Sequence, residues 1–141
     1  MKKGFTLLEL IVVIIILGIL ATLGFAQYGR MVERSRGAEA RAVLGAIRTS
    51  AAAYRLENGA VTGFNSTLAG IGATVNEIPS ACRSTHYFSY AVTGAGADNF
   101  TAIAQRCTSG GKTPDGVAGN ITLASNFSLT GSDVWGGVGG Y

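Results

Sequence analysis

The chain of 141 residues has room for one small globular core beside a long apolar segment, so we expect no second domain. Charged residues make up only 13% of the chain, and its net charge of +3 includes Lys2 and Lys3. Without these two lysines the net charge falls from +3 to +1, so charge gives no argument for a nucleic-acid partner.

Segment 5–25 is apolar except for one carboxylate, Glu9. About 21 residues of helix rise roughly 30 Å, which matches the hydrocarbon thickness of a bilayer, so we expect this segment to span a membrane. Lys2 and Lys3 precede it and favour a cytoplasmic N-terminus, with the remaining chain on the other side. A secretory signal carries its small cleavage residue after the apolar region, whereas here Gly4 comes before it.

The run Gly4-Phe5-Thr6-Leu7-Leu8-Glu9 resembles the processing motif of type IV prepilins and of the type II secretion pseudopilins. The resemblance implies that a membrane prepilin peptidase cleaves between Gly4 and Phe5 and that the new N-terminal Phe5 is N-methylated. It also implies that residues 1–4 are a leader that is removed. Residues 5–25 would remain as the transmembrane and assembly half of an N-terminal helix.

Glu9 needs an explanation because a carboxylate in lipid is costly and a buried one must be paired or neutral. Cleavage before Phe5 would create a new α-amine in the same membrane layer. As the resemblance implies, Glu9 of an incoming subunit meets the Phe5 amine of a neighbour and sets the axial register during assembly. The alternative is an ordinary single-pass anchor, in which Glu9 is protonated or snorkels to the bilayer surface.

Residues 26–58 have the pattern of an amphipathic helix, with apolar residues at steps of three and four: Val32, Val43, Leu44, Ile47, Ala51 and Tyr54. Asn58 and Gly59 tolerate the left-handed conformation that ends helices, so we expect one helix from Phe5 to Asn58. Members of the resembled family often have a proline about 21 residues after the cleavage site. This chain has Ala26 there, and the glycines on either side allow a bend or the close approach of another helix.

Four arginines of this helix are seven residues apart and therefore drift only about 20° per step around its axis: Arg34, Arg41, Arg48 and Arg55. We expect this basic stripe to be a solvated face. One alternative is ion pairing with Glu33, Glu39 or Glu57 of neighbouring subunits, and another is contact with DNA or a second polyanion. No aromatic residues alternate with the stripe, so a nucleic-acid partner is not expected.

Residues 59–141 carry the signals of loops and short strands. Two strands are expected at His86–Thr93 and Asn99–Cys107, and a weaker pair at Ile121–Leu123 and Phe127–Leu129 around Ser125-Asn126. Residues 134–141 are interpreted as a last edge strand or as a contact between subunits. A sheet of three or four strands would bury one face against the Val43, Ile47 and Tyr54 side of the helix. The predicted fold is therefore α+β and pilin-like.

Cys82 and Cys107 are the only cysteines, and a location outside the cytoplasm favours a disulfide between them over two free thiols. The chain has one histidine, His86, in an aromatic strand where a structural role is expected. Asp115 and Asp133 lie in glycine-rich loops, and the resemblance to major pseudopilins raises calcium binding as an alternative to ordinary turn chemistry. We expect no catalytic site, no resident metal and no cofactor.

We therefore predict a noncatalytic structural subunit that forms a homopolymer through its N-terminal helix. The resemblance implies three partners: a prepilin peptidase, an inner-membrane assembly platform and a cytoplasmic ATPase. The precursor would be a single-pass protein of the inner membrane, and the product a periplasmic or extracellular filament. Within this class a type IV pilin is preferred and a major pseudopilin of type II secretion is the alternative. A membrane-anchored binding domain that never polymerises is the alternative of another class.

Overall fold

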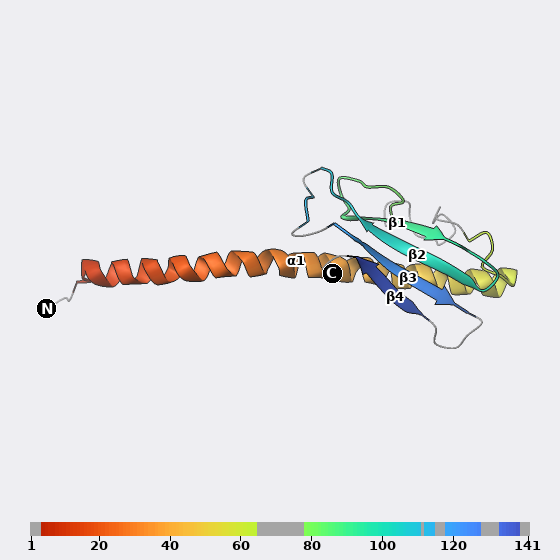
Figure 1. Cartoon of the computed structure of the whole chain (residues 1–141), viewed down its shortest axis with the longest axis horizontal. Coiled ribbons are helices and arrows are strands. Elements are labelled where there is room, and N and C mark those ends of the chain that lie inside the picture. Colours follow the sequence, from red (N-terminus) through yellow and green to blue (C-terminus); the bar gives the residue numbers. More distant parts are fainter. Residues whose placement is uncertain (1–3, 65–77, 111, 115–117, 128–132, 139–141) are drawn as a thin grey trace. The chain divides into compact units, whose positions relative to one another are not determined.

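The computed structural model describes residues 4–64, 78–110, 112–114, 118–127 and 133–138. It contains one long helix and a four-stranded antiparallel sheet (Figure 1), so the predicted α+β class is confirmed. The elements are α1 (Leu7–Asn58), β1 (Phe88–Thr93), β2 (Asn99–Arg106), β3 (Asn120–Asn126) and β4 (Val134–Val138). The chain divides into two compact units, Met1–Val32 and Glu33–Tyr141, and each is described on its own below.

The C-terminus of α1 is where the sequence predicts it. The helix ends at Asn58, and Gly59 follows with φ 76°, a conformation that costs glycine little. The Gly59 amide donates to the Arg55 carbonyl at 2.8 Å, which is the single bond of a left-handed C-cap. The Asn58 side-chain amide donates to the Tyr54 carbonyl at 2.9 Å. The last turn is therefore closed by both residues of the predicted stop signal.

The strands follow one another in the order β1-β2-β3-β4, and every neighbouring pair is antiparallel. The two expected strands at His86–Thr93 and Asn99–Cys107 are confirmed as β1, which begins two residues later, and β2, which ends one residue earlier. Of the two interpretations of residues 134–141, the edge strand is confirmed for Val134–Val138, because β4 pairs only with β3 in the described sheet; residues 139–141 lie outside the described residues.

The predicted turn at Ser125-Asn126 is wrong. Both residues belong to β3, which pairs with β2 on one side and with β4 on the other. Ser125 continues the inward alternation that Ile121 and Leu123 begin, and its buried hydroxyl donates to Asp133 at 2.6 Å. A serine favours a turn when its partner is not known, and here the partner, Asp133, lies beyond the end of the strand. The weaker pair also included a strand at Phe127–Leu129, of which residues 128 and 129 lie outside the described residues.

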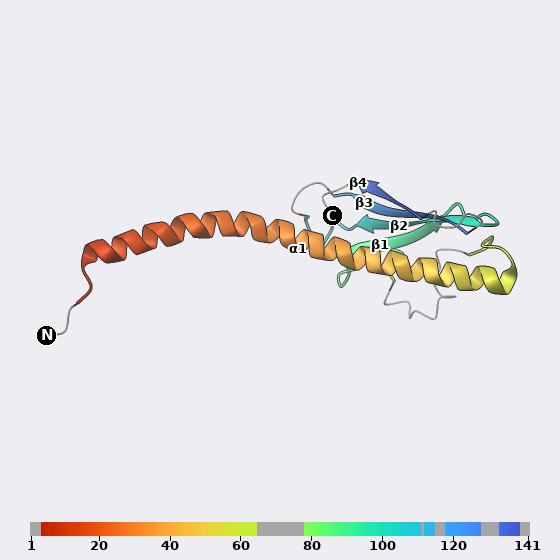
Figure 2. The same cartoon turned by 90° about the horizontal axis from the view of Figure 1, so that it is seen from below.

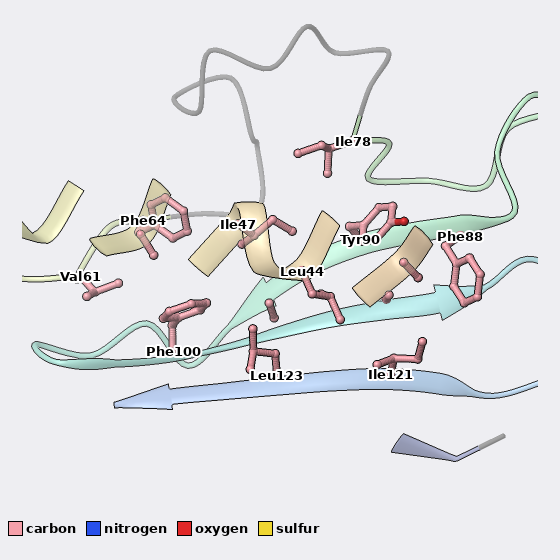
Figure 3. Packing of buried hydrophobic residues seen from close by; sticks show 14 residues of the cluster. Leu44, Ile47, Val61, Phe64, Ile78, Phe88, Tyr90, Phe100, Ile121 and Leu123 are labelled. Atoms are coloured by element: carbon pink, nitrogen blue, oxygen red, sulfur yellow. The ribbon is translucent and has the colours of Figure 1, made fainter. Parts of the chain in front are cut away.

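The core of the second unit lies between the later turns of α1 and the inner face of the sheet (Figures 2 and 3). Figure 3 shows Leu44 and Ile47 of α1 facing residues of three strands: Tyr90 of β1, Phe100 of β2 and Leu123 of β3. Val43 and Tyr54 are partly buried against it, so the helix face predicted to meet the sheet is confirmed. The fully or nearly fully buried members are Ala40, Leu44, Ile47, Ala51, Val61, Phe64, Ile78, Phe88, Tyr90, Phe100, Ala102, Ala104, Ile121 and Leu123.

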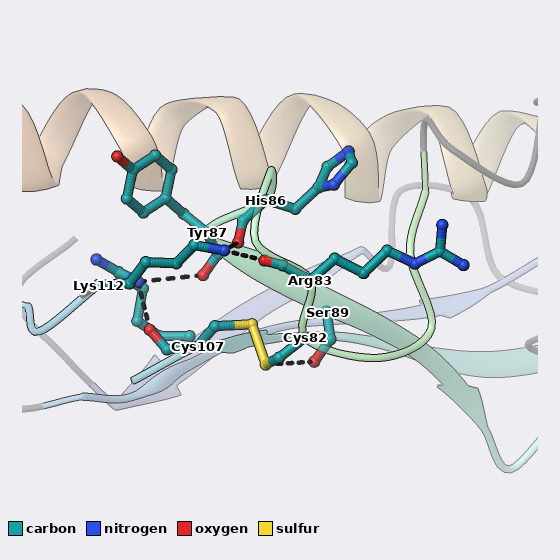
Figure 4. Close-up of a disulfide and its surroundings, with 8 residues drawn as sticks. Cys82, Arg83, His86, Tyr87, Ser89, Cys107 and Lys112 are labelled. Carbon is teal, nitrogen blue, oxygen red and sulfur yellow. Dashed lines mark hydrogen bonds between the residues drawn. A yellow bond between two sulfur atoms is a disulfide. The ribbon is translucent and has the colours of Figure 1, made fainter. Parts of the chain in front are cut away.

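The predicted disulfide is present between Cys82 and Cys107, with an S–S distance of 2.06 Å (Figure 4). It joins the segment that precedes β1 to the residue that follows β2, and the Cys107 amide donates to the Tyr87 carbonyl at 2.9 Å. Nearby, the Lys112 ammonium donates to the carbonyls of Arg83 and His86. This end of the sheet is therefore fixed by one covalent bond and several polar contacts.

We predict that the double substitution Cys82→Ser with Cys107→Ser lowers the free energy of unfolding by about 3 kcal/mol, because the disulfide closes a loop with a sequence separation of 25 residues. Urea unfolding of the full chain in detergent, followed by circular dichroism of the sheet, measures the change. Reduction of the wild-type chain should reproduce it. An unfolding midpoint that is unchanged in both samples would contradict the prediction.

Candidate functional site at the helix N-terminus

Thr6 and Glu9 form a capping box at the start of α1. The Glu9 amide donates to the Thr6 hydroxyl at 3.3 Å, and the Thr6 amide donates to the Glu9 carboxylate at 2.9 Å. The Thr6 hydroxyl also donates to the same carboxylate oxygen, Oε2, at 2.8 Å. Two amides that a helix start leaves without partners are thus satisfied reciprocally. The helix begins at Leu7, two residues after the expected Phe5, because Thr6 occupies the N-cap.

The capping box fixes where the Glu9 carboxylate lies. It is held beside the backbone amide of Thr6, the residue that directly follows Phe5. Gly4, Phe5 and Thr6 themselves precede the helix, and the Phe5 side chain is 88% exposed. The three residues that the sequence singles out, Gly4, Phe5 and Glu9, therefore gather within the first turn and the short segment before it.

In the first unit, the helix that follows this site exposes a continuous apolar surface. The side chains from Leu7 to Phe25 are exposed around the whole circumference of the helix, as Leu10, Ile14 and Leu17 illustrate. Helix α1 is the one helix in the described part of the chain that is long and apolar enough to cross a membrane. An apolar surface of this extent needs lipid or other helices around it.

The arginine stripe does not remain a fully solvated face in the second unit. Arg48 forms an ion pair with Asp133 at 2.5 Å, and Arg55 forms one with Asp98 at 2.6 Å. The expectation of a solvated stripe is therefore wrong for these two arginines, while Arg34 and Arg41 are exposed. Asp98 is 43 residues from Arg55 along the chain, so helix spacing alone could not find it.

Asp133, one of the two candidate calcium ligands, is bound by Arg48 and by the Ser125 hydroxyl. Asp115, the other, lies outside the described residues. His86 precedes β1, and its Nδ1 atom is 2.8 Å from the Thr85 hydroxyl. Within the ranges that the structure describes, no three His, Cys, Asp or Glu side chains gather as a metal site would require.

A buried ion pair that the sequence did not reveal joins Glu33 to Arg106. The Arg106 side chain is 0% exposed and that of Glu33 6%, and two guanidinium nitrogens donate to the carboxylate at 3.0 and 3.2 Å. The same guanidinium donates to the carbonyls of Tyr87 and Cys107. Arg36 also contacts Glu33. The alternative in which Glu33 pairs with arginines of neighbouring subunits is wrong, because Arg36 and Arg106 of its own chain bind it.

The environment of Glu33 lowers the pKa of its carboxyl. Burial by itself would raise this pKa, but hydrogen bonds from Arg106 and Arg36, together with their positive charges, outweigh the loss of solvent. The pKa of the carboxyl therefore lies below its ordinary value of 4.5. The pair contributes to stability only while Glu33 is ionised.

The comparisons with known proteins agree on the N-terminal segment and extend beyond it. The family model described as the prokaryotic N-terminal methylation motif matches residues 1–25. The chain is 32% identical over 134 residues to the fimbrial protein EcpC of Eikenella corrodens, which covers 95% of this chain and 80% of that relative. No solved structure matches the chain.

Two further relatives match over shorter stretches. The type IV major fimbrial protein FimA of Dichelobacter nodosus is 40% identical over 50 residues, or 36% of this chain and 32% of the relative. The fimbrial protein of Neisseria meningitidis serogroup B (strain ATCC BAA-335 / MC58) is 38% identical over 78 residues, or 55% of this chain and 45% of the relative.

We predict that Thr6→Ala loosens the first turn of α1, because it removes the hydroxyl of the capping box. Losing an N-cap costs about 1 kcal/mol, equivalent to about fivefold faster opening. Amide hydrogen exchange of Glu9, whose amide donates to the Thr6 hydroxyl, should accelerate by this factor when measured by NMR on the full chain in detergent. Thr6→Ser keeps a hydroxyl and serves as the control. Equal exchange rates in Thr6→Ala and wild type would refute the role of the cap.

We also predict that Glu33 makes an acid-sensitive contribution to the free energy of unfolding. The folded-state pKa is the lower one, so this contribution is complete above pH 4.5 and is lost as pH falls from 4.5 through the folded-state value. The free energy of unfolding should therefore decline more steeply below pH 4.5 in the wild type than in Glu33→Gln. Urea titrations of the full chain at a series of pH values measure both slopes. If Glu33→Gln keeps the wild-type slope, the assignment to Glu33 is wrong.

Proposed function

Because this chain belongs to the family of type IV pilins and type II secretion pseudopilins, we propose that it is a structural subunit of a type IV pilus filament. Its relatives are structural fimbrial proteins, and the chain is a structural protein, not an enzyme. The observation that carries the proposal is the match to a fimbrial protein over 95% of the chain. The exposed apolar helix that begins at the capping box supports it.

Processing is proposed between Gly4 and Phe5, followed by N-methylation of Phe5. The match to the N-terminal methylation motif over residues 1–25 supports this assignment. The position of the bond supports it as well, because Gly4 and Phe5 are exposed and lie outside the helix. A peptidase can therefore reach this bond without unwinding α1. The partner in this step would be a prepilin peptidase of the membrane.

Glu9 is proposed to direct assembly. Cleavage gives Phe5 a positively charged α-amine, and the Glu9 carboxylate of another subunit is the complementary charge in the same membrane layer. An unpaired carboxylate in lipid is costly, whereas pairing with an amine removes much of that cost. The capping box supports this role because it holds the carboxylate in one place at the end of the helix.

Packing of the first units against one another is proposed to form the filament core. A single helix cannot bury a surface that is apolar on every side, but a bundle of such helices can. At Gly18 and Gly24 no atom lies within 4 Å of where a Cβ would stand, so a neighbouring helix has room to approach closely. Helix α1 continues through Ala26, the position at which the family often has a proline.

The remaining partners and locations are proposed from the family. The precursor would be held in the inner membrane with a cytoplasmic N-terminus, which Lys2 and Lys3 favour. An inner-membrane platform and a cytoplasmic ATPase would extract and assemble the subunits into an extracellular filament. A major pseudopilin of type II secretion would share the motif and the helix. The fimbrial names of the relatives favour the pilus.

We predict that Glu9→Ala is inserted into the membrane and cleaved like the wild type, yet is largely missing from filaments sheared from the cell surface. The measurement is the amount and intact mass of the chain in membrane and sheared fractions. Wild-type chains in the sheared fraction should begin at methylated Phe5. Ser35→Ala, at an exposed position on the same helix, is the control.

Three other outcomes would each contradict one part of the proposed function. Glu9→Ala filaments in wild-type amounts would remove the assembly role of the carboxylate. A chain that retains residues 1–4 and occurs only in membranes would indicate an anchored domain that does not polymerise. Loss of exoprotein secretion on deletion, with no surface fibres in the parent strain, would identify a pseudopilin.

A further inference from the structure

The two edges of the sheet differ in how they are protected. β1 and β4 are the outermost strands (Figure 1). At the β1 edge the Tyr90 amide donates to the Pro79 carbonyl at 2.8 Å, and the Pro79 side chain is fully buried. The segment before β1 therefore binds an amide that the edge would otherwise leave without a partner. In the described part of the chain, no backbone bond of this kind reaches β4.

The edge strand β4 lacks the features that usually prevent an edge from pairing with another chain. Natural edges are protected by charged residues, by proline, by bulges or by a covering segment. The strand Val134–Val138 has the sequence Val-Trp-Gly-Gly-Val, without a charge or a proline, and it pairs with β3 without a bulge. Val134 is 64% exposed. An edge strand also directs every second N–H and C=O away from the sheet, so β4 presents hydrogen-bonding groups beside apolar surface.

Trp135 lies at the margin of the inner face of the sheet. It stands opposite Leu123 in the register, so the two side chains share one face. Leu123 is 0% exposed, whereas Trp135 is 48% exposed. An indole ring is among the largest apolar groups that a protein can bury, and tryptophan is enriched where proteins contact partners. About half of this ring is thus left for a partner to cover.

The two glycines after Trp135 are required by the contact with β3. A Cβ at Gly136 would stand 2.9 Å from Oγ1 of Thr122, and a Cβ at Gly137 would stand 2.2 Å from the Asn120 carbonyl oxygen. Gly137 also has φ 141°, which residues with a side chain rarely adopt. Because residues two apart in a strand share a face, Gly137 leaves space on the same face as the indole ring.

We propose that β4 pairs with β4 of a second copy of this chain, antiparallel and centred on Gly136. In this register Trp135 stands opposite Gly137 of the second copy and on the same face. Each indole ring then covers the space that a glycine leaves, as aromatic residues do for glycines of edge strands. The strand is therefore complementary to itself, as a twofold interface requires. A charged strand would find no opposite charge on β4.

This pairing needs only two folded copies, so it does not rest on the proposed function. The subunits of a filament follow one another head to tail, whereas a twofold axis relates two copies head to head. If the chain forms the proposed filament, β4 would therefore join subunits of two filaments. One strand pair is a small interface and is weak between single chains, but many copies on two filaments would act together.

The test uses Trp135 as the probe, because it is the only tryptophan of the chain. The full chain is kept in phosphocholine detergent at a constant ratio of detergent to chain, while its concentration rises from about 1 μM to about 1 mM, the range of weak association. Pairing buries the indole ring, so its emission should shift to shorter wavelength and resist acrylamide quenching as the concentration rises. Adding detergent at a fixed chain concentration should cause no such shift.

Two variants separate pairing through β4 from association through the apolar helix. Val134→Lys places a charge at both ends of the twofold strand pair and should raise the dissociation constant about tenfold. Thr93→Lys places the same charge at the end of β1, on the opposite edge of the sheet, and should leave the dissociation constant unchanged. Circular dichroism confirms that both variants are folded.

The register is tested by NMR on an equimolar mixture of isotope-labelled and unlabelled wild-type chains. Filtered NOEs should connect the indole protons of Trp135 to the α-protons of Gly137 of the second copy. Intermolecular NOEs that occur only in α1, or equal dissociation constants for the two lysine variants, would overturn the proposal. Emission that does not change with chain concentration would also overturn it and leave β4 to a strand of a different protein. Emission that follows the detergent concentration would assign this edge to a lipid surface instead.

Discussion

The second unit depends on the packing of α1 against the inner face of the sheet, and both elements contribute alanine to their shared core. Ala40 and Ala51 of α1 and Ala102 and Ala104 of β2 are each 0% exposed. Alanine has no side-chain atom beyond Cβ, so larger residues such as Leu44 must fill the space between the helix and the sheet. A larger residue at any of these alanines would force the layers apart, at a typical cost of about 1 to 3 kcal/mol.

The parts of the fold that depend on local chemistry could be predicted from the sequence. The spacing of Leu44, Ile47 and Ala51 identifies the buried helix face, and Asn58 with Gly59 identifies the end of α1. The first two strands follow from alternation over their whole length. Ser125 shows the limit of this approach, because whether a serine ends a strand or continues it depends on a partner elsewhere in the chain.

Only part of the candidate site could be predicted from the sequence. The processing motif identifies Gly4, Phe5 and Glu9, but it does not indicate that Thr6 caps the helix. Its spacing to Glu9 is itself the signature of a capping box, so a local signal existed. The ion pair of Glu33 and Arg106 has no local sequence signal, because residues 73 apart meet only once the sheet is folded. The sequence therefore points to the proposed processing site more directly than to the polar contacts that stabilise the domain.

The buried ion pair also bears on how the protein would respond to mechanical force. Glu33 is the first residue of the second unit, and α1 is continuous through it. A pull along this helix would therefore enter the domain at Glu33 and load its bonds to Arg106, whose neighbour Cys107 is covalently joined to Cys82. Tension would therefore act on directional polar bonds backed by a disulfide at the point where the helix enters the domain.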